Sequence, residues 1–338
     1  MVIICICLCI CITQGCTSKQ LNERMVIQGI GIDYIDDNYV VTVMYMNTDE
    51  TDQSKPFKTL TGNGRTITEA VTNIVSENGL EPLYSHNSFI LLGNSLCNHG
   101  VSEALEFFAG YYQCRPSVNI MVGTQNAYEL MNVEDITPQA IADIAESKNT
   151  TGRALTMPMY KFMSDMINET SSACTGLLTV ENDKLKYSGV AVFDNDIISY
   201  TLNDSQTMGL MLLRGESDIS AEVIPLGDEN KSFALKYEDN DIDVYVKDYQ
   251  LHCNITIKGE ASVYEYTKAD EEAEDKIEEK INTLTEEALK ASITKGNDIF
   301  YMGKILRQKD YESYASITDW NTMVKDCVYT VNSDISVK

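Results

Sequence analysis

The sequence contains few of the residues on which common enzymatic chemistry depends. Histidine occurs only at positions 86, 99 and 252 of the 338 residues, and none of the three lies in a His-Glu-x-x-His zinc motif. Neither a Gly-x-Ser-x-Gly nucleophile elbow nor a P-loop is present. Enzymes that depend on these motifs are therefore disfavoured. The 51 acidic residues are too numerous for any one carboxylate pair to be informative.

Long hydrophobic runs are also lacking. The apolar run from Val2 to Ile12 is shorter than the roughly 20 residues that a membrane-spanning helix needs. Cysteines alternate along it at positions 5, 7, 9 and 11, but their Ile and Leu neighbours disfavour the thiolates that a metal site requires. The run instead has the length of the hydrophobic region of an export signal.

A single cysteine follows this run directly after a glycine. A bacterial lipoprotein signal is cut before such a cysteine, whose thiol takes up lipid, so the sequence predicts a signal peptide over residues 1–15 and lipid attachment at Cys16. Two features depart from that pattern. No positively charged residue lies between Met1 and the apolar run, and Thr13 stands where such signals prefer leucine. An ordinary signal peptide and an apolar amino terminus without consequence are the alternatives.

Positive charge is scarce in the chain. It has 26 Lys and Arg against 51 Asp and Glu, a net charge of −25 and a pI of about 4.4. Such a field repels phosphate backbones and anionic lipid surfaces, so nucleic-acid binding is disfavoured. Attachment to a membrane would therefore need a tether and could not rest on basic patches.

The remaining cysteines do not form a disulfide framework. Beyond Cys16 they occur at positions 97, 114, 174, 253 and 327, an odd number that contains no Cys-x-x-Cys. We predict that they are small core residues, with at most a pair or two bridged.

The first half of the chain alternates between strand and helix patterns, which is typical of an α/β arrangement. Strands are predicted at 25–33, 39–46, 88–93 and 117–123, with a turn at 36–38. Helical patterns cover residues 62–79, 101–108 and 157–167, and a further helix is predicted to start at residue 127. Thr66 and Glu69 form a capping box, and Gly79 marks a helix end.

The second half contains more strands. A hairpin is predicted at 187–202 around Asp194-Asn195-Asp196, followed by a helix at 205–213. Further strands are predicted at 220–224, 232–237, 242–249 and 252–266, separated by acidic turns such as 238–243. Asp239, Asp241 and Asp243 are spaced like a calcium loop, but Val244 replaces the required glycine, so a turn is the better interpretation. A long acidic helix at 268–295 and a strand at 327–337 complete the prediction.

Two motifs allow a functional and a structural interpretation. Gly29 and Gly31 begin like a dinucleotide fingerprint, but Tyr34 replaces the third glycine, so strand packing is favoured. His86 has no neighbouring nucleophile in the sequence, and we interpret it as a histidine that is hydrogen-bonded at the start of a strand.

Several stretches in the same order resemble the Ger(x)C family, the lipoprotein C subunits of nutrient germinant receptors of endospore-forming bacteria. The resemblance rests on Cys16, Gly29-Ile-Gly-Ile-Asp33, Gly64-Arg65, Ser85-His86, Arg115-Pro116, the Gly189–Phe193 hairpin, Asp298, Gly303 and Trp320. Phe300-Tyr301-Met302 occupies a stretch where the family commonly has a glycine.

The resemblance implies an α+β, multi-domain protein with about three small domains, each a mixed or antiparallel sheet packed with helices. We expect a signal peptide at 1–15, an α/β domain at 16–180, a hairpin-helix region at 181–215 and an α+β domain at 216–338.

The implied role is that of a non-catalytic subunit of a nutrient germinant receptor. It would be lipid-anchored at the outer face of the spore inner membrane and would assemble with the A and B membrane subunits. The structural or interaction candidates are Gly29, Gly31, Asp33, Ser85, His86, Gly189, Phe193, Asp298 and Trp320. No catalytic residue, metal site, cofactor or nucleic-acid partner is expected. An extracellular solute-binding lipoprotein is the alternative function.

Overall fold

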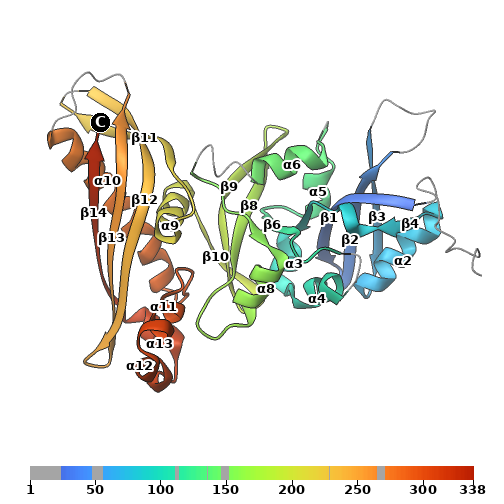
Figure 1. The fold of residues 1–338 in the computed structure, drawn as a ribbon. Coiled ribbons are helices and arrows are strands. Elements are labelled where there is room, and N and C mark those ends of the chain that lie inside the picture. The colour runs from blue at the N-terminus through green and yellow to red at the C-terminus, as the bar shows by residue number, and fades with distance from the viewer. Residues whose placement is uncertain are drawn as a thin grey trace, which may run out of the picture.

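Two sheet-containing units lie end to end in the molecule (Figure 1). The computed structural model describes residues 24–47, 56–110, 114–134, 136–145, 152–227, 229–264 and 271–338. The predictions for the signal peptide and Cys16 lie outside these residues. Within the described part, no helix is both long enough and apolar enough to cross a membrane.

The first unit is built on a ten-stranded mixed sheet. Its main path runs β10-β9-β8-β6-β5-β1-β2-β3, while β4 pairs with β1 and β7 with β6. The central neighbours β1, β5, β6 and β8 are parallel, and antiparallel pairs extend both sides. The strands are β1 (Arg24–Ile35), β2 (Asn38–Met46), β3 (Phe57–Gly64), β4 (Glu81–Leu83), β5 (Phe89–Leu92), β6 (Asn119–Gly123), β7 (Met157–Pro158), β8 (Cys174–Glu181), β9 (Lys184–Asp194) and β10 (Ile197–Leu202).

Helices cover both faces of this sheet. Alternate residues of a strand point to opposite faces, so Ile90 and Leu92 of β5 join the main core while Phe89 and Leu91 join a smaller one. The main core takes residues from α2 (Ile67–Asn78), α3 (Asn94–His99), α4 (Ser102–Gly110) and α8 (Met159–Ile167). The smaller core takes residues from α5 (Ala127–Met131) and α6 (Pro138–Ala145).

The second unit is a four-stranded sheet in the order β11-β12-β13-β14 with the long helix α10 packed against it (Figure 1). The strands are β11 (Ile219–Leu226), β12 (Glu229–Lys247), β13 (Gln250–Val263) and β14 (Val328–Val337). The helices are α10 (Glu271–Ile293), α11 (Met302–Lys309), α12 (Tyr311–Ser316) and α13 (Trp320–Lys325). The chain passes between the sheets through α9 (Asp204–Arg214), which packs against α10.

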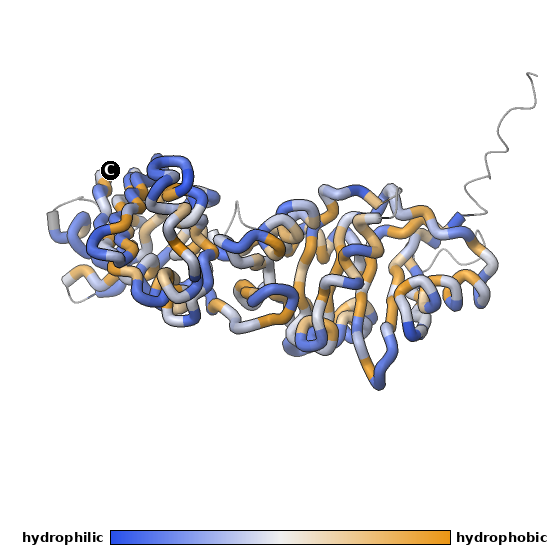
Figure 2. The backbone as a smooth tube through the Cα atoms, turned by 90° about the horizontal axis from the view of Figure 1, so that it is seen from below, coloured by the Kyte–Doolittle hydropathy of each residue, from blue (hydrophilic) through white to orange (hydrophobic). Residues whose placement is uncertain are grey.

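The hydrophobic pattern matches this architecture. The helical spacing predicts an apolar stripe of Ile277, Ile281, Leu284, Ala288 and Ala291 on α10. The first four are at most 1% exposed, and Ala291 is half-buried against the core. Apolar segments run through the interior of the first unit and polar segments lie mainly at its edges and loops (Figure 2).

Local signals set several element boundaries as predicted. Asp36 and Asp37 have φ values of 50° and 58°, the left-handed pair that a two-residue hairpin turn requires. Thr66 accepts the Glu69 amide at the start of α2, and Gly79 ends that helix with φ 73°. The Glu69 carboxylate accepts a hydrogen bond from the Arg65 amide. In a strict capping box this carboxylate would accept the amide of the N-cap residue, Thr66.

One predicted turn is wrong. Residues 238–243 lie inside β12, where Asp239, Asp241 and Asp243 pair with residues of β13. The alternation of Ile242, Val244 and Val246 with polar residues favours a strand, and pairing with β13 fixes it. The turn instead falls at Asp248-Tyr249. The predicted helix from residue 62 also began too early, because Gly62 and Gly64 belong to β3.

The α+β class is confirmed, with two sheets where about three sheet-containing domains were expected. The hairpin β9–β10 pairs with β8 and so extends the first sheet, which is why it forms no separate sheet. The boundaries at 180 and 215 stay predictions. The first lies near the β8–β9 turn and the second at the end of α9. The five described cysteines are all buried and unbridged.

Candidate functional site

The predicted site residues fall into separate clusters of the fold. Gly29 and Gly31 sit in β1, where each lets a neighbouring side chain approach the backbone. A Cβ on Gly29 would overlap the Phe89 ring, and one on Gly31 would lie 2.5 Å from Met131 Sδ. These close contacts support the interpretation that Gly29 and Gly31 serve strand packing and are not part of a dinucleotide-binding motif.

Asp33 ends this motif as a fully buried carboxylate. Its Oδ1 accepts the Ala127 amide at 2.7 Å and its Oδ2 accepts the Tyr128 amide at 3.0 Å. The side chain therefore caps α5, whose own N-cap residue, Asn126, makes no such bond. Burial raises the pKa of Asp33, and the two backbone donors oppose that rise. The motif thus holds α5 against β1.

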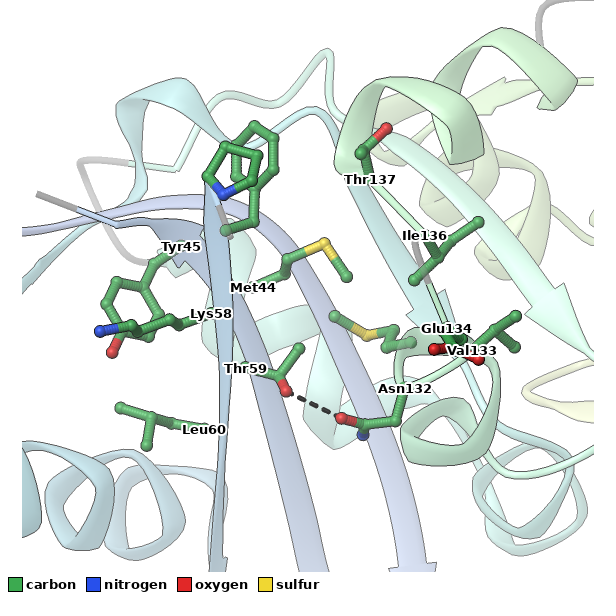
Figure 3. A pocket seen from close by; sticks show the side chains of 13 residues that line it. Met44, Tyr45, Lys58, Thr59, Leu60, Asn132, Val133, Glu134, Ile136 and Thr137 are labelled. Atoms are coloured by element: carbon green, nitrogen blue, oxygen red, sulfur yellow. Dashed lines mark hydrogen bonds between the residues drawn. The ribbon is translucent and has the colours of Figure 1, made fainter. Parts of the chain in front are cut away.

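The far end of α5 borders a pocket of about 460 Å³ (Figure 3). Met44 and Met131 are 1% exposed and contribute sulfur-bearing side chains to its wall. Thr59 Oγ1 donates to Asn132 Oδ1 at 2.8 Å, which ties the edge strand β3 to the segment after α5. Gly31 and Asp33 therefore position one side of this pocket.

Ser85 and His86 lie elsewhere, in a single 3-10 turn before β5. His86 is exposed and Ser85 is half-buried. The adjoining residue, Asn87, is buried, and its carbonyl accepts Arg115 Nη2 at 3.1 Å. The segment before β5 is thus held by the arginine of the Arg-Pro motif.

Gly189 and Phe193 belong to β9. Gly189 has φ 117°, and a Cβ there would collide with the Leu202 carbonyl, so only glycine fits this place in the hairpin. Phe193 is fully buried and packs edge-to-face on Phe162 of α8, with ring centroids 5.1 Å apart. Both residues therefore fix packing within the first unit, at the β9–β10 hairpin and against α8.

Asp298 lies in the loop before α11 and is also fully buried. Its Oδ1 accepts the Phe300 and Met302 amides, and its Oδ2 accepts the Gly303 amide at 2.8 Å. Burial raises the pKa of Asp298 to about 6 against the opposing effect of these donors. The Trp320 side chain is 6% exposed, and its indole N–H makes no hydrogen bond to a described residue.

This loop is part of a polar junction that joins the two units. The Ser172 amide donates to the Asp298 carbonyl, and Asn297 Nδ2 donates to Ser172 Oγ. Tyr301 donates its hydroxyl to Asp165 Oδ2 of α8 at 2.8 Å. Residues 165 and 301 are far apart in the sequence, so no local pattern indicated this contact.

Arg214, at the end of α9, is the centre of the junction. Its side chain is 1% exposed, Nε donates to the Ile299 carbonyl at 2.9 Å, and Nη2 donates to Cys174 Sγ at 3.2 Å. The guanidinium lies 4.7 Å from the centre of the Tyr301 ring, with Glu216 3.9 Å away. The sequence analysis did not single out Arg214 or Asp165, and it predicted Cys174 only as a small core residue.

The chemistry of the junction is that of packing and charge pairing. Burial raises the pKa of the Cys174 thiol, which disfavours a reactive thiolate even beside Arg214. No group of three or more His, Cys, Asp or Glu side chains among the described residues is arranged to hold a metal ion. The buried carboxylates of Asp33 and Asp298 are occupied by backbone donors.

Comparison with known families places these clusters in context. The model of the spore germination protein N-terminal domain matches residues 17–180, and the model of the spore germination B3/GerAC-like C-terminal domain matches residues 188–338. The chain belongs to the Ger(x)C family of spore germination proteins. A search of curated proteins found no match. The crystal structure of the GerBC protein is similar in fold, with a TM-score of 0.57 and 17% identity over 91% of this chain and 96% of that one.

Several residues that carry the resemblance thus cap or pack elements of the two units and the junction. Tyr301 illustrates this. It stands in the stretch where the resemblance led us to expect a glycine, and its φ of 63° is the left-handed conformation that glycine adopts without strain. Its hydroxyl bond to Asp165 and its contact with Arg214 stabilise a tyrosine in that position.

Proposed function

We propose that this chain is the C subunit of a nutrient germinant receptor, tethered by lipid at Cys16 to the outer face of the spore inner membrane. It would assemble there with the A and B membrane subunits and act by docking, with no catalytic step of its own. The observation that carries the proposal is the order of the two family models, which match residues 17–180 and 188–338 and begin directly after Cys16.

The positions of the motif residues support a docking role. Asp33 caps α5, Asp298 caps α11, and the glycines of β1 and β9 allow close packing. These residues make a fixed scaffold with buried polar junctions, as a protein needs when it presents a surface to partners. A lipid tether would confine that scaffold near its partners and raise its effective concentration there.

A solute-binding lipoprotein is the second candidate, and the pocket beside β3 is the feature that favours it. Binding proteins with two lobes and crossing strands close around a ligand between the lobes. Here the described chain passes between the sheets once, through α9, and buried groups fill the junction. Calorimetry with candidate nutrients would detect saturable binding if the alternative holds.

The tether is tested by replacing Cys16 with alanine in the native spore. We expect Cys16→Ala to move the chain from the membrane to the soluble fraction and to impair germination. Cys11→Ala is the matched control, because it changes a leader cysteine that is not the acylated one, and it should leave both unchanged. A Cys16→Ala chain that still sediments with membranes in normally germinating spores would contradict the proposal.

A further inference from the structure

The tip of the long β12–β13 hairpin presents an almost fully exposed tyrosine. Tyr249 is 97% exposed, whereas the other exposed tyrosines among the described residues, at positions 128, 160, 264 and 311, range from 37% to 63%. An aromatic ring in water loses the burial that normally stabilises it. The hairpin tip therefore exposes a large apolar side chain that contributes almost no buried surface to the stability of the fold.

The backbone at this tip is also unfavourable for tyrosine. Asp248 and Tyr249 form a two-residue turn with φ values of 52° and 62°, a geometry that strongly prefers Asn-Gly. The other left-handed non-glycine residues described are Asp or Asn, except Tyr301. Tyr301 is held by Asp165 and Arg214, but the structure shows no hydrogen bond or ring contact for Tyr249 among the described residues. Strain retained without a structural reason points to a function.

The tip is held in a fixed position. Lys247 pairs with Gln250 across the turn, and Gln250 Nε2 donates to the Asp326 carbonyl at 2.8 Å, which joins the hairpin to the end of α13. A groove of about 310 Å³ lies between them, with Val246, Ile317 and Met323 among its lining residues and Tyr249 at its side. The hairpin and α13 lie side by side at one end of the second unit (Figure 1).

Acidic side chains border this apolar surface, with Lys247 and Lys325 beside them in the sequence. Asp248 is next to Tyr249 in the turn, and Asp319 and Asp326 line the groove. Two copies of the chain would bring these carboxylates together, and an anionic lipid surface would repel them. The charge instead complements a protein surface whose apolar pocket is bordered by basic side chains.

We propose that Tyr249, Val246, Ile317 and Met323, which we call the hairpin-tip surface, form a docking site for such a basic-rimmed protein. Tyr249 is its anchor and enters the apolar pocket of the partner. Asp248 and Asp326 pair with the basic rim, while Asp319 caps α13 through its bonds to Thr322. Under the proposed function, on which this assignment rests, the partner is a membrane subunit of the receptor.

The test separates docking from folding. Asp248→Asn combined with Tyr249→Gly gives the preferred Asn-Gly turn, so the thermal midpoint of the purified chain should stay the same or rise. The tagged full-length chain is then purified from spore membranes, and the recovered A and B subunits are quantified. We expect recovery to fall at least tenfold for this variant and for Tyr249→Asn. Tyr160→Ala, at a half-exposed tyrosine of α8, should leave recovery unchanged.

Each outcome decides a separate question. Equal recovery by the wild-type and Asn-Gly chains overturns the docking site while the receptor assignment stands. No recovery of A or B by the wild-type chain contradicts the proposed function itself. Binding of the wild-type chain to phosphatidylglycerol vesicles, or its self-association, would also overturn the assignment if the Asn-Gly variant abolishes it.

Discussion

The Asp298 carboxylate accepts the Gly303 amide at 2.8 Å, and Gly303 in turn packs against Thr170 of the first unit. A Cβ on Gly303 would lie 2.6 Å from Thr170 Cβ. The loop before α11 is therefore held by the buried Asp298 carboxylate and by contact with Thr170 of the first unit. Asp298 is therefore a structural acid, and its ionisation should lower the stability of the folded chain.

Stability should depend on pH through Asp298. Its pKa in the folded chain is about 6, above the ordinary 3.8, so the folded state binds this proton more tightly than the unfolded state does. Its stabilising contribution is complete below about pH 4 and is lost as pH rises through about 6, a change of about 3 kcal/mol. Asp298→Asn cannot titrate, so the wild-type advantage over it should shrink by most of that amount, about 2 kcal/mol, from pH 4 to pH 7.

Urea unfolding of both chains across this range measures the difference, and the subtraction cancels the other titrating groups. An advantage that grew with pH would mean that the three backbone donors stabilise the carboxylate more than burial destabilises it.

Removing the cap on α5 should destabilise the first unit. Asp33→Ala leaves the Ala127 and Tyr128 amides without their acceptor and should cost about 2 kcal/mol of unfolding free energy. Hydrogen exchange at these two amides should accelerate. Asp334→Ala, which removes an exposed aspartate of β14, is the matched control and should change stability by less than about 0.5 kcal/mol. Equal effects of the two variants would contradict the capping role.

The close contact of Gly31 with Met131 should appear as an energetic coupling. Gly31→Ala places a methyl group against Met131 Sδ and Ala127 Cβ and should cost about 1–3 kcal/mol. In a Met131→Ala background the same change should cost about 1 kcal/mol less, because the crowding side chain is gone. Gly110→Ala, where a Cβ would meet nothing within 4 Å, serves as the control. An identical cost in both backgrounds would show that this contact does not explain the glycine.

Arg214 should be the residue whose loss most weakens the junction. Arg214→Met removes the bonds to Ile299 and Cys174 and leaves Glu216 and Asp165 without a buried cation, at a cost of about 3 kcal/mol. Arg65→Met, at an exposed arginine, should stay within about 0.5 kcal/mol. Denaturant unfolding measures both. A near-neutral Arg214→Met would mean that apolar packing alone joins the units.

Much of the fold could be predicted from the sequence because its signals are local. The Asp36-Asp37 turn, the Thr66 cap and the apolar stripe of α10 each occupy a few residues whose chemistry dictates the outcome. The resemblance singled out the motif residues, and the structure explains several of them as helix caps or as glycines at close contacts.

The remainder depends on partners that are distant in the sequence. Residues 57–64 carry two glycines and little alternation, and they form β3 because they pair with β2. Residues 238–243 look like an acidic turn, yet fourteen pairings between β12 and β13 make them strand. The junction brings Asp165, Arg214 and Tyr301 together from three separate segments, which no local pattern contains.

The most direct test of the account is the composition of the complex that this chain forms in dormant spores. A tagged full-length chain, solubilised in mild detergent from the spore inner membrane, should bring down the A and B subunits in fixed stoichiometry, with a diacylated Cys16 as its first residue. Recovery of the chain from the soluble fraction, with an unmodified Cys16 and neither subunit attached, would contradict it.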